Sequence, residues 1–171
     1  EIEQTVFSYE MAEAISKFAV TMKKDARIHI KVDTGMNRIG FKPTEESVGQ
    51  VQRIQKLPNI KIQGIFTHFA CADEKDKTSA RHQKELFDQF VSKIEEKGIE
   101  IPVKHVSNSA AIMDLRECRM DMVRSGIITY GLYPSEEVDK SAIDLKPALS
   151  LISHVIHVKE VGPGEGVSYG S

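Results

Sequence analysis

Residues 27–33 read Arg-Ile-His-Ile-Lys-Val-Asp, a stretch in which polar and apolar side chains alternate strictly. This period of two predicts a β-strand with one apolar face and one face that carries His29, Lys31 and Asp33. A strand of an open parallel sheet is covered by helices on both sides, so both of its faces are apolar. The interior of a closed barrel tolerates charge near its catalytic mouth. The stretch therefore favours a barrel, although periodicity alone leaves an open doubly wound sheet as the alternative.

The segments around this strand alternate between strand and helix patterns. Further strands are predicted at 5–8, 61–68, 103–108 and 120–124. A period of about 3.6 predicts helices over 9–24, 44–57, 79–97 and 109–115. We expect Thr44 to be the N-cap of the second helix and Pro58 to end it. Sustained alternation of this kind predicts an α/β fold with a parallel sheet and right-handed crossovers.

Composition and charge exclude several classes of protein. The 171 residues are 40% hydrophobic, which argues against disorder, and the net charge of −2 provides no field that attracts nucleic acid or an anionic membrane. Cys71 and Cys118 have no CxxC spacing, which fits free thiols better than a disulfide or a zinc site. No apolar stretch reaches the roughly 18 residues of a membrane span, and residues 1–10 do not resemble a secretory signal. We expect a cytoplasmic protein with no metal, nucleic-acid or membrane partner.

The sequence changes character after Pro134. Residues 135–146 begin with a polar, acidic run and predict a linker, whereas 147–160 are rich in Val, Ile and Leu and predict β structure, followed by a tight glycine-rich turn. A complete β/α barrel has eight strands and about 250 residues. We therefore expect residues 1–134 to form an incomplete barrel and residues 147–171 to begin a mostly β domain, in a chain that is a piece of a longer protein.

Polar residues gather where the expected strands end. Functional side chains of a β/α barrel lie at the carboxyl ends of its strands and in the loops that follow. Taken singly, each such residue is more simply interpreted as a hydrogen-bonded or ion-paired group, but polar residues recur after every strand except the first. The candidates are Lys31, Asp33, Arg38, Thr67, His68, Asn108, Ser109, Arg124, Gly126 and Ile127.

The segment 123–127 indicates a phosphorylated ligand. It combines a strand end, small residues and the start of a helical turn, where free backbone N–H groups can bind phosphate. Ser109 on the preceding loop adds a hydroxyl group. The alternative is that Gly126 only permits a turn, which its spacing does not exclude.

Several longer stretches resemble one family. They are KVDTGMNRIGF at 31–41, THFACAD at 67–73, HVSNSAA at 105–111, MVRSGI at 122–127, YGLYP at 130–134 and GVSYG at 166–170. In this order and at this spacing they resemble the alanine racemases, over almost the whole chain. The resemblance implies a fold-type III enzyme that uses pyridoxal 5′-phosphate, with a TIM-type (β/α)8 barrel followed by a mostly β domain. It also implies a homodimer whose active sites lie at the subunit interface.

The resemblance assigns catalytic roles to three residues. Tyr169 matches the tyrosine base that the neighbouring subunit donates, and a phenol needs nearby cationic or donor groups to act as a base near pH 7. His68 matches the residue that contacts this tyrosine and connects it to Arg124. Arg124 matches the arginine that faces the cofactor ring nitrogen and keeps it unprotonated, which favours racemisation over transamination.

The remaining matches concern binding. Arg38 matches the arginine near the substrate carboxylate, and Lys31 matches a lysine that is often carbamylated in the family, with an unmodified lysine as the alternative. Ser109, Gly126 and Ile127 match the cofactor-phosphate site, which agrees with the phosphate prediction above. Asn108 is expected to support that site rather than to touch the reacting atoms.

The function implied is interconversion of L-alanine and D-alanine, which supplies D-alanine for peptidoglycan. The family's Schiff-base lysine lies in a motif that resembles VVKANAYGHG, and the 171 residues contain no such motif. We therefore expect the chain alone to be inactive, with unpaired strands at the edge of its partial barrel. The alternatives are a serine or broad-spectrum racemase, a decarboxylase of the same fold, and a non-catalytic barrel that binds the same cofactor.

Overall fold

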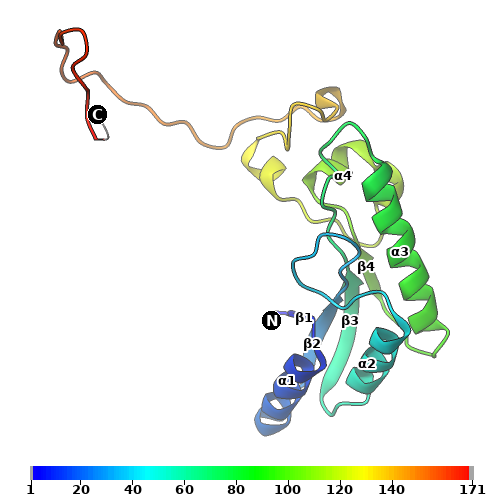
Figure 1. Ribbon diagram of the computed structural model, residues 1–171. Coiled ribbons are helices and arrows are strands. Elements are labelled where there is room, and N and C mark those ends of the chain that lie inside the picture. Colours follow the sequence, from blue (N-terminus) through cyan, green and yellow to red (C-terminus); the bar gives the residue numbers. More distant parts are fainter. Residues whose placement is uncertain (1, 170–171) are drawn as a thin grey trace.

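A computed structural model describes residues 2–169 and contains one parallel sheet of four strands. The strands are β1 (Gln4–Val6), β2 (Ala26–Lys31), β3 (Ile60–Phe66) and β4 (Val103–His105). They lie side by side in the order in which they occur in the chain, and every neighbouring pair is parallel (Figure 1). In an open doubly wound sheet the strand order reverses at a switch point. The unreversed order confirms the prediction of a partial barrel wall.

The helices form a layer on one side of this sheet. They are α1 (Tyr9–Met22), α2 (Glu45–Gln55), α3 (Thr78–Glu95) and the short α4 (Ser109–Asp114), followed by the 3-10 turns η1 (Arg116–Cys118), η2 (Ile127–Tyr130) and η3 (Lys140–Ala142). Helix α1 packs against α2, and α2 packs against α3, as expected for successive right-handed crossovers. The Thr44 hydroxyl accepts a hydrogen bond from the Ser47 N–H at 3.3 Å, which confirms Thr44 as the N-cap of α2.

The hydrophobic core lies between the sheet and this helix layer. Ile28 and Ile30 of β2 and Ile65 of β3 are fully buried on the side of the sheet that faces the helices. They pack in one cluster with the apolar stripes of α2 and α3, which include Val51 and Phe87. The core therefore contains the side chains from only one side of the sheet, the side that faces the helices.

The opposite side of the sheet is polar, as the alternation of residues 27–33 predicted. His29 and Lys31 of β2 lie there and are buried, as is His105 of β4. A register shift after Ile28 brings Gly64 of β3 opposite His29. A Cβ atom at Gly64 would overlap the His29 ring and would lie 2.8 Å from the carbonyl oxygen of Val103, so the close approach of these strands requires glycine.

The predicted strand at 120–124 is wrong, although this segment does run beside β4. The Asp121 N–H donates to the Lys104 carbonyl at 3.1 Å, and the Arg124 N–H donates to the Ser107 carbonyl at 3.0 Å. The N–H of Lys104, however, donates to the Asp121 carboxylate at 2.8 Å. Because a side chain takes the place of a backbone acceptor, no regular ladder forms.

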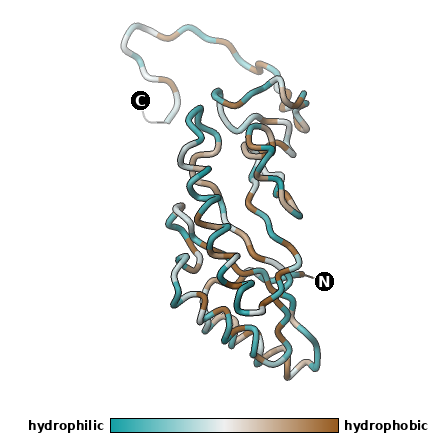
Figure 2. Tube along the Cα trace, turned by 90° about the vertical axis from the view of Figure 1, so that its right-hand side faces the viewer, coloured by the Kyte–Doolittle hydropathy of each residue, from teal (hydrophilic) through white to brown (hydrophobic). Residues whose placement is uncertain are grey.

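The β structure predicted for 147–160 is also absent from the part of the chain that the structure describes. These residues form an extended segment that leads away from the sheet and the helices (Figure 1). Apolar residues recur along it (Figure 2), and Leu151 and Ile156 are almost fully exposed. An isolated strand has no partner for its backbone N–H and C=O groups, so a suitable sequence alone does not form a sheet.

The tight turn expected in 161–166 is present, since the Glu165 N–H donates to the Gly162 carbonyl at 3.1 Å. Glu1, at the start of the predicted barrel, and Gly170 and Ser171, at the end of the predicted β domain, lie outside the described residues. The domain limits at 134 and 147 stay a prediction, although Val138 is buried in the core and Ser135 donates a hydrogen bond to the Asp73 carbonyl. Across residues 2–169, no helix is both long enough and apolar enough to cross a membrane.

Candidate active site

A cavity of about 510 Å³ lies beside the carboxyl ends of β3 and β4. Six of the residues singled out in the sequence line it: His68, Asn108, Ser109, Arg124, Gly126 and Ile127. The loops after successive parallel strands meet at one edge of the sheet, which explains why residues distant in the sequence gather here. The predicted grouping of these six residues is therefore present in the structure.

Arg124 is the most extensively bonded residue of the cavity. Its guanidinium donates to the carbonyl oxygen of Thr67 at 2.7 Å, to that of Val106 at 3.2 Å and to that of His105 at 3.3 Å. Within residues 2–169, no carboxylate lies within ion-pair distance of this cation. Burial lowers the pKa of Arg124 to about 10, so the guanidinium keeps its charge at neutral pH. It is a fixed donor held mainly by backbone oxygens.

His105 is a contact of Arg124 that the strand-end rule did not identify. Its Nδ1 lies 2.5 Å from Nη1 of Arg124, and its ring stacks on Phe66 at 4.7 Å between centroids. Burial, and then the charge of Arg124, lower the pKa of His105 to about 3, so this imidazole is neutral at neutral pH. The rule missed His105 because the strand predicted at 103–108 was expected to end at Asn108, whereas β4 ends at His105 itself.

His68 lies next to this group at the end of β3. Burial lowers its pKa to about 4, with further lowering from the charges of Arg124, Arg38 and Lys31. The carbonyl oxygen of His68 accepts a hydrogen bond from Gln83 at 3.1 Å. His68 is therefore a neutral imidazole beside a permanent cation, and it can donate one hydrogen bond from one ring nitrogen and accept one at the other.

Gln83 of α3 is a second functional-site neighbour that the sequence did not reveal. It is buried and donates to the Thr34 hydroxyl at 3.3 Å as well as to the His68 carbonyl, while its own oxygen accepts from the Ala70 N–H at 2.9 Å. Thr34 is in turn 2.7 Å from Thr67. Gln83 thus joins the loop after β2 to the loop after β3. It sits at a helical core position, where a pattern of apolar residues gives no signal for a polar one.

Lys31 lies on the polar side of β2 and is almost completely buried. Its ammonium donates to the Val32 carbonyl at 2.6 Å. Burial is the main reason that its pKa falls to about 8; Asp33 opposes this change, whereas Arg124 and Arg38 add to it. The ammonium form therefore still predominates at neutral pH, but Lys31 loses its proton more readily than an exposed lysine does.

Arg38 lies on the exposed loop that follows β2. The Asp33 carboxylate holds this loop, because it accepts from the Asn37 N–H at 2.9 Å and from the Lys42 ammonium at 2.6 Å. Gly40 closes the loop with φ +132°, and a Cβ atom there would lie 2.6 Å from the Asp33 nitrogen. These contacts explain the position of the loop. The interactions of the described residues include no contact between Arg38 and Lys31.

The part of the cavity lined by Asn108, Ser109, Gly126 and Ile127 is suited to an anion. The Ser109 hydroxyl accepts from the Gly126 N–H at 2.9 Å, and Gly126 leads directly into η2, which begins with Ile127. Asn108 caps α4, since its side chain accepts from the Ala111 N–H at 3.1 Å. Two helical turns therefore begin at this edge, and their first N–H groups carry partial positive charge. A phosphate group fits this arrangement.

Tyr169 is not part of this cavity. It lies on the extended C-terminal segment and is fully exposed, and that segment leads away from the sheet (Figure 1). The predicted catalytic residues His68 and Arg124 are therefore brought together within one chain, whereas Tyr169 is not brought to them.

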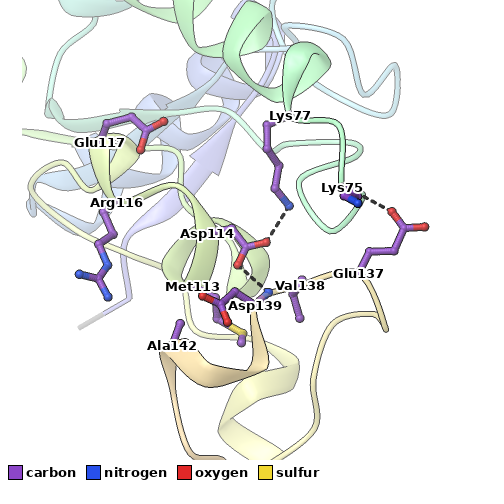
Figure 3. Close-up of a pocket in the computed structure, with 10 residues that line it drawn as sticks. All are labelled: Lys75, Lys77, Met113, Asp114, Arg116, Glu117, Glu137, Val138, Asp139 and Ala142. Atoms are coloured by element: carbon purple, nitrogen blue, oxygen red, sulfur yellow. Dashed lines mark hydrogen bonds and ion pairs between the residues drawn. The ribbon is translucent and has the colours of Figure 1, made fainter.

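A second cavity, of about 530 Å³, lies between α4, η1 and the segment 137–142 (Figure 3). Its most buried charged groups, Lys77 and Asp114, form an ion pair at 2.7 Å. The Asp114 carboxylate also accepts a hydrogen bond from the Asp139 N–H at 3.1 Å. Glu137 accepts from the Lys75 N–H at 2.6 Å. These contacts attach the segment after Pro134 to α4, and none of the residues matched a sequence motif.

The family model described as "Alanine racemase, N-terminal domain" matches residues 1–134. The chain is 51% identical over 169 residues to the alanine racemase of Clostridium tetani, covering 99% of this chain and 44% of that protein. It is similar to the solved structure of alanine racemase from Clostridium difficile 630, with a TM-score of 0.91, 47% identity and coverage of 99% of this chain and 44% of that one. The alanine racemase of Bacillus anthracis with bound L-Ala-P gives a TM-score of 0.84 at 35% identity, covering 97% and 43%. The chain spans less than half the length of these relatives.

Proposed function

The chain belongs to the alanine racemase family, and on that premise we propose that it forms part of a pyridoxal 5′-phosphate-dependent enzyme that interconverts L-alanine and D-alanine. One observation carries the proposal: Arg124, a cation without a carboxylate partner in the described structure, lies in the same cavity as Ser109 and Gly126. A cation and an anion-binding edge in the lining of one cavity suit a ligand with a ring nitrogen and a phosphate.

The residues present fit this cofactor. The cavity, at about 510 Å³, is within the usual size range of cofactor sites, roughly 300–1,000 Å³. Ser109, Gly126 and Ile127 would hold the phosphate through a hydroxyl group and backbone N–H groups at the start of η2. When bound, the cofactor withdraws electrons from the amino acid attached to it and so weakens the bond between Cα and its hydrogen.

Arg124 would face the ring nitrogen of the cofactor. A guanidinium is permanently charged and can only donate hydrogen bonds, so it keeps a neighbouring ring nitrogen unprotonated. The four hydrogen bonds that Arg124 makes to carbonyl oxygens and to His105 fix its position before any ligand binds. This role limits how strongly the cofactor withdraws electrons, which favours return of a proton to Cα over transamination.

The proton transfer itself needs bases on both faces of Cα. Tyr169 would serve one face from a second copy of the chain, because its own segment leads away from the cavity, and this implies a homodimer. His68 would accept a hydrogen bond from that phenol or donate one to the phenolate, since its lowered pKa keeps the imidazole neutral. The second base is the lysine that the family carries in a motif absent from these 171 residues.

Arg38 and Lys31 complete the proposal on the substrate side. Arg38 would pair with the substrate carboxylate. The lowered pKa of Lys31, about 8, favours its carbamylation, because carbon dioxide reacts with the neutral amine. The carbamate would then be an anion able to hold Arg38. A cytoplasmic enzyme that supplies D-alanine for peptidoglycan is the role we assign to the whole protein.

The test is racemisation of L-alanine by the whole enzyme that contains this chain, measured as D-alanine formed with and without pyridoxal 5′-phosphate. We expect turnover only with the cofactor, and none by the 171-residue chain alone. Arg124→Glu should increase the pyruvate formed per racemisation event, whereas Arg116→Glu, at an exposed position of η1, should not. Turnover by the isolated 171-residue chain would refute the inference that the Schiff-base lysine lies outside these residues. Equal rates with L-serine and L-alanine would favour a broad-spectrum racemase.

A further inference from the structure

A continuous line of hydrogen bonds crosses the polar side of the sheet from Arg124 to Glu3. Arg124 Nη1 is 2.5 Å from His105 Nδ1, His105 Nε2 is 2.9 Å from His29 Nδ1, and His29 Nε2 is 2.7 Å from the Glu3 carboxylate. The line begins after β4 and ends just before β1. It passes over β3 only because Gly64 has no side chain to separate the two histidine rings.

The chemistry of the two ends fixes the position of every proton between them. A guanidinium can only donate, so His105 accepts at Nδ1 and, being neutral, carries its proton on Nε2. His105 then donates to His29 Nδ1, which leaves the proton of His29 on Nε2, directed at Glu3. A carboxylate can only accept, so the line runs in one direction from the cation to the anion.

If Glu3 were absent, the hydrogen bonds through the two neutral imidazoles could run in either of two directions. The reverse direction would place a proton on His105 Nδ1, facing an N–H of Arg124, and that hydrogen bond would be lost. Glu3 therefore reinforces the direction that Arg124 requires, because its carboxylate can only accept from Nε2 of His29. The other charged groups nearby are Arg27, 3.8 Å from Glu3, Asp121, which faces His105, and Lys31, 5.7 Å from the centre of the Phe66 ring.

We propose that Glu3 and His29 are positioning residues for Arg124, which set the tautomers of both histidines so that His105 always accepts from the guanidinium. Glu3 also supplies the negative charge for a buried cation that has no carboxylate in direct contact in the described structure. The consequence for catalysis rests on the proposed function, in which Arg124 faces the cofactor ring nitrogen. The tautomers themselves do not depend on it.

The first experiment is therefore independent of activity. Long-range 1H–15N correlation spectra of the unaltered 171-residue chain, recorded at about pH 8 where a histidine ordinarily carries a single ring proton, should show that proton on Nε2 of both His29 and His105. Glu3→Gln can accept or donate at the end of the line, so we expect the signals of at least one of the two rings to shift toward an average of both tautomers. Glu13→Gln, which removes another partly exposed carboxylate, paired with Lys17 on α1, should leave both rings unchanged.

The second experiment uses the whole enzyme with its cofactor. Glu3→Gln should lower kcat about tenfold with little change in KM, as expected when the partner of a site histidine is removed, and Glu3→Asp should restore part of the loss. Unchanged tautomers in Glu3→Gln, or a proton on Nδ1 of His105 in the unaltered chain, would overturn the inference. If the unaltered enzyme does not racemise alanine while the tautomers shift as expected, the proposed function fails and the positioning role stands.

Discussion

Replacing Gly64 by alanine tests the close approach of β2, β3 and β4. The added methyl group would overlap the His29 ring and lie 2.8 Å from the Val103 carbonyl oxygen. His29 could rotate away, which would break its hydrogen bond to His105, but the Val103 carbonyl is backbone, so β4 would also have to shift. Overpacking of this kind costs about 1–3 kcal/mol.

Loss of the hydrogen bond between two buried rings adds about 1–3 kcal/mol. The total of about 2–6 kcal/mol corresponds to a fall in melting temperature of roughly 4–24 °C for a chain of this size. The assay is thermal unfolding of the 171-residue chain followed by circular dichroism.

Gly49→Ala provides the matched control. Gly49 lies within α2 with no atom within 4 Å of an added Cβ, so the same substitution should stabilise the chain by about 0.5–1 kcal/mol. The two glycines thus predict shifts of opposite sign. If Gly64→Ala melts at the temperature of the unaltered chain or above it, the steric and hydrogen-bonding explanation of the polar face is refuted.

Three further predictions concern groups around the site. Gln83→Leu, which leaves the Ala70 N–H and the His68 carbonyl without their partner, should lower the free energy of unfolding by about 2–4 kcal/mol in urea titrations, and the exposed Gln89→Leu should not. Lys77→Met, which leaves Asp114 without its buried cation, should lower the free energy of unfolding by about 3–5 kcal/mol in the same assay. Lys75→Met should have a much smaller effect, and a small loss in Lys77→Met would show that the ion pair is dispensable. Stability should fall as the pH drops from about 6.5 toward 4, because His68 and His105, with pKa values of about 4 and about 3, take up protons more readily when the chain is unfolded. This dependence should weaken in His105→Gln and persist in His82→Gln, at an exposed position of α3; a pH-independent unfolding free energy would contradict the neutral state of both rings.

The sequence predicted the sheet and the helix layer well because both depend on local patterns. The alternation of residues 27–33 is a property of one strand, and it correctly indicated a polar interior face. The strand ends also indicated His68, Ser109 and Arg124 as neighbours, since parallel strands bring their carboxyl ends to one edge. Local order was therefore enough to find most of the cavity.

The sequence did not predict features that depend on register between strands. His29 and His105 are separated by 76 positions, and they meet only because of the register shift in β3. Glu3 and Gln83 likewise act through contacts with distant segments. The strand predicted at 120–124 was wrong because one side chain, Asp121, takes a hydrogen bond that the backbone would otherwise accept.

The register shift in β3 has a consequence for insertions and deletions. Ile62 and Ile65 are an odd number of residues apart, yet both face the helices, because the strand contains one extra residue between them. Side chains in a strand normally switch faces at every step, so removal of that residue would reverse the parity of everything on one side of it. Either Gly64 and Phe66 would turn toward the helices, or Ile60 and Ile62 would turn toward the barrel interior. A single codon lost from this strand would exchange the inside and the outside of half of it, a larger change than any substitution within it could cause.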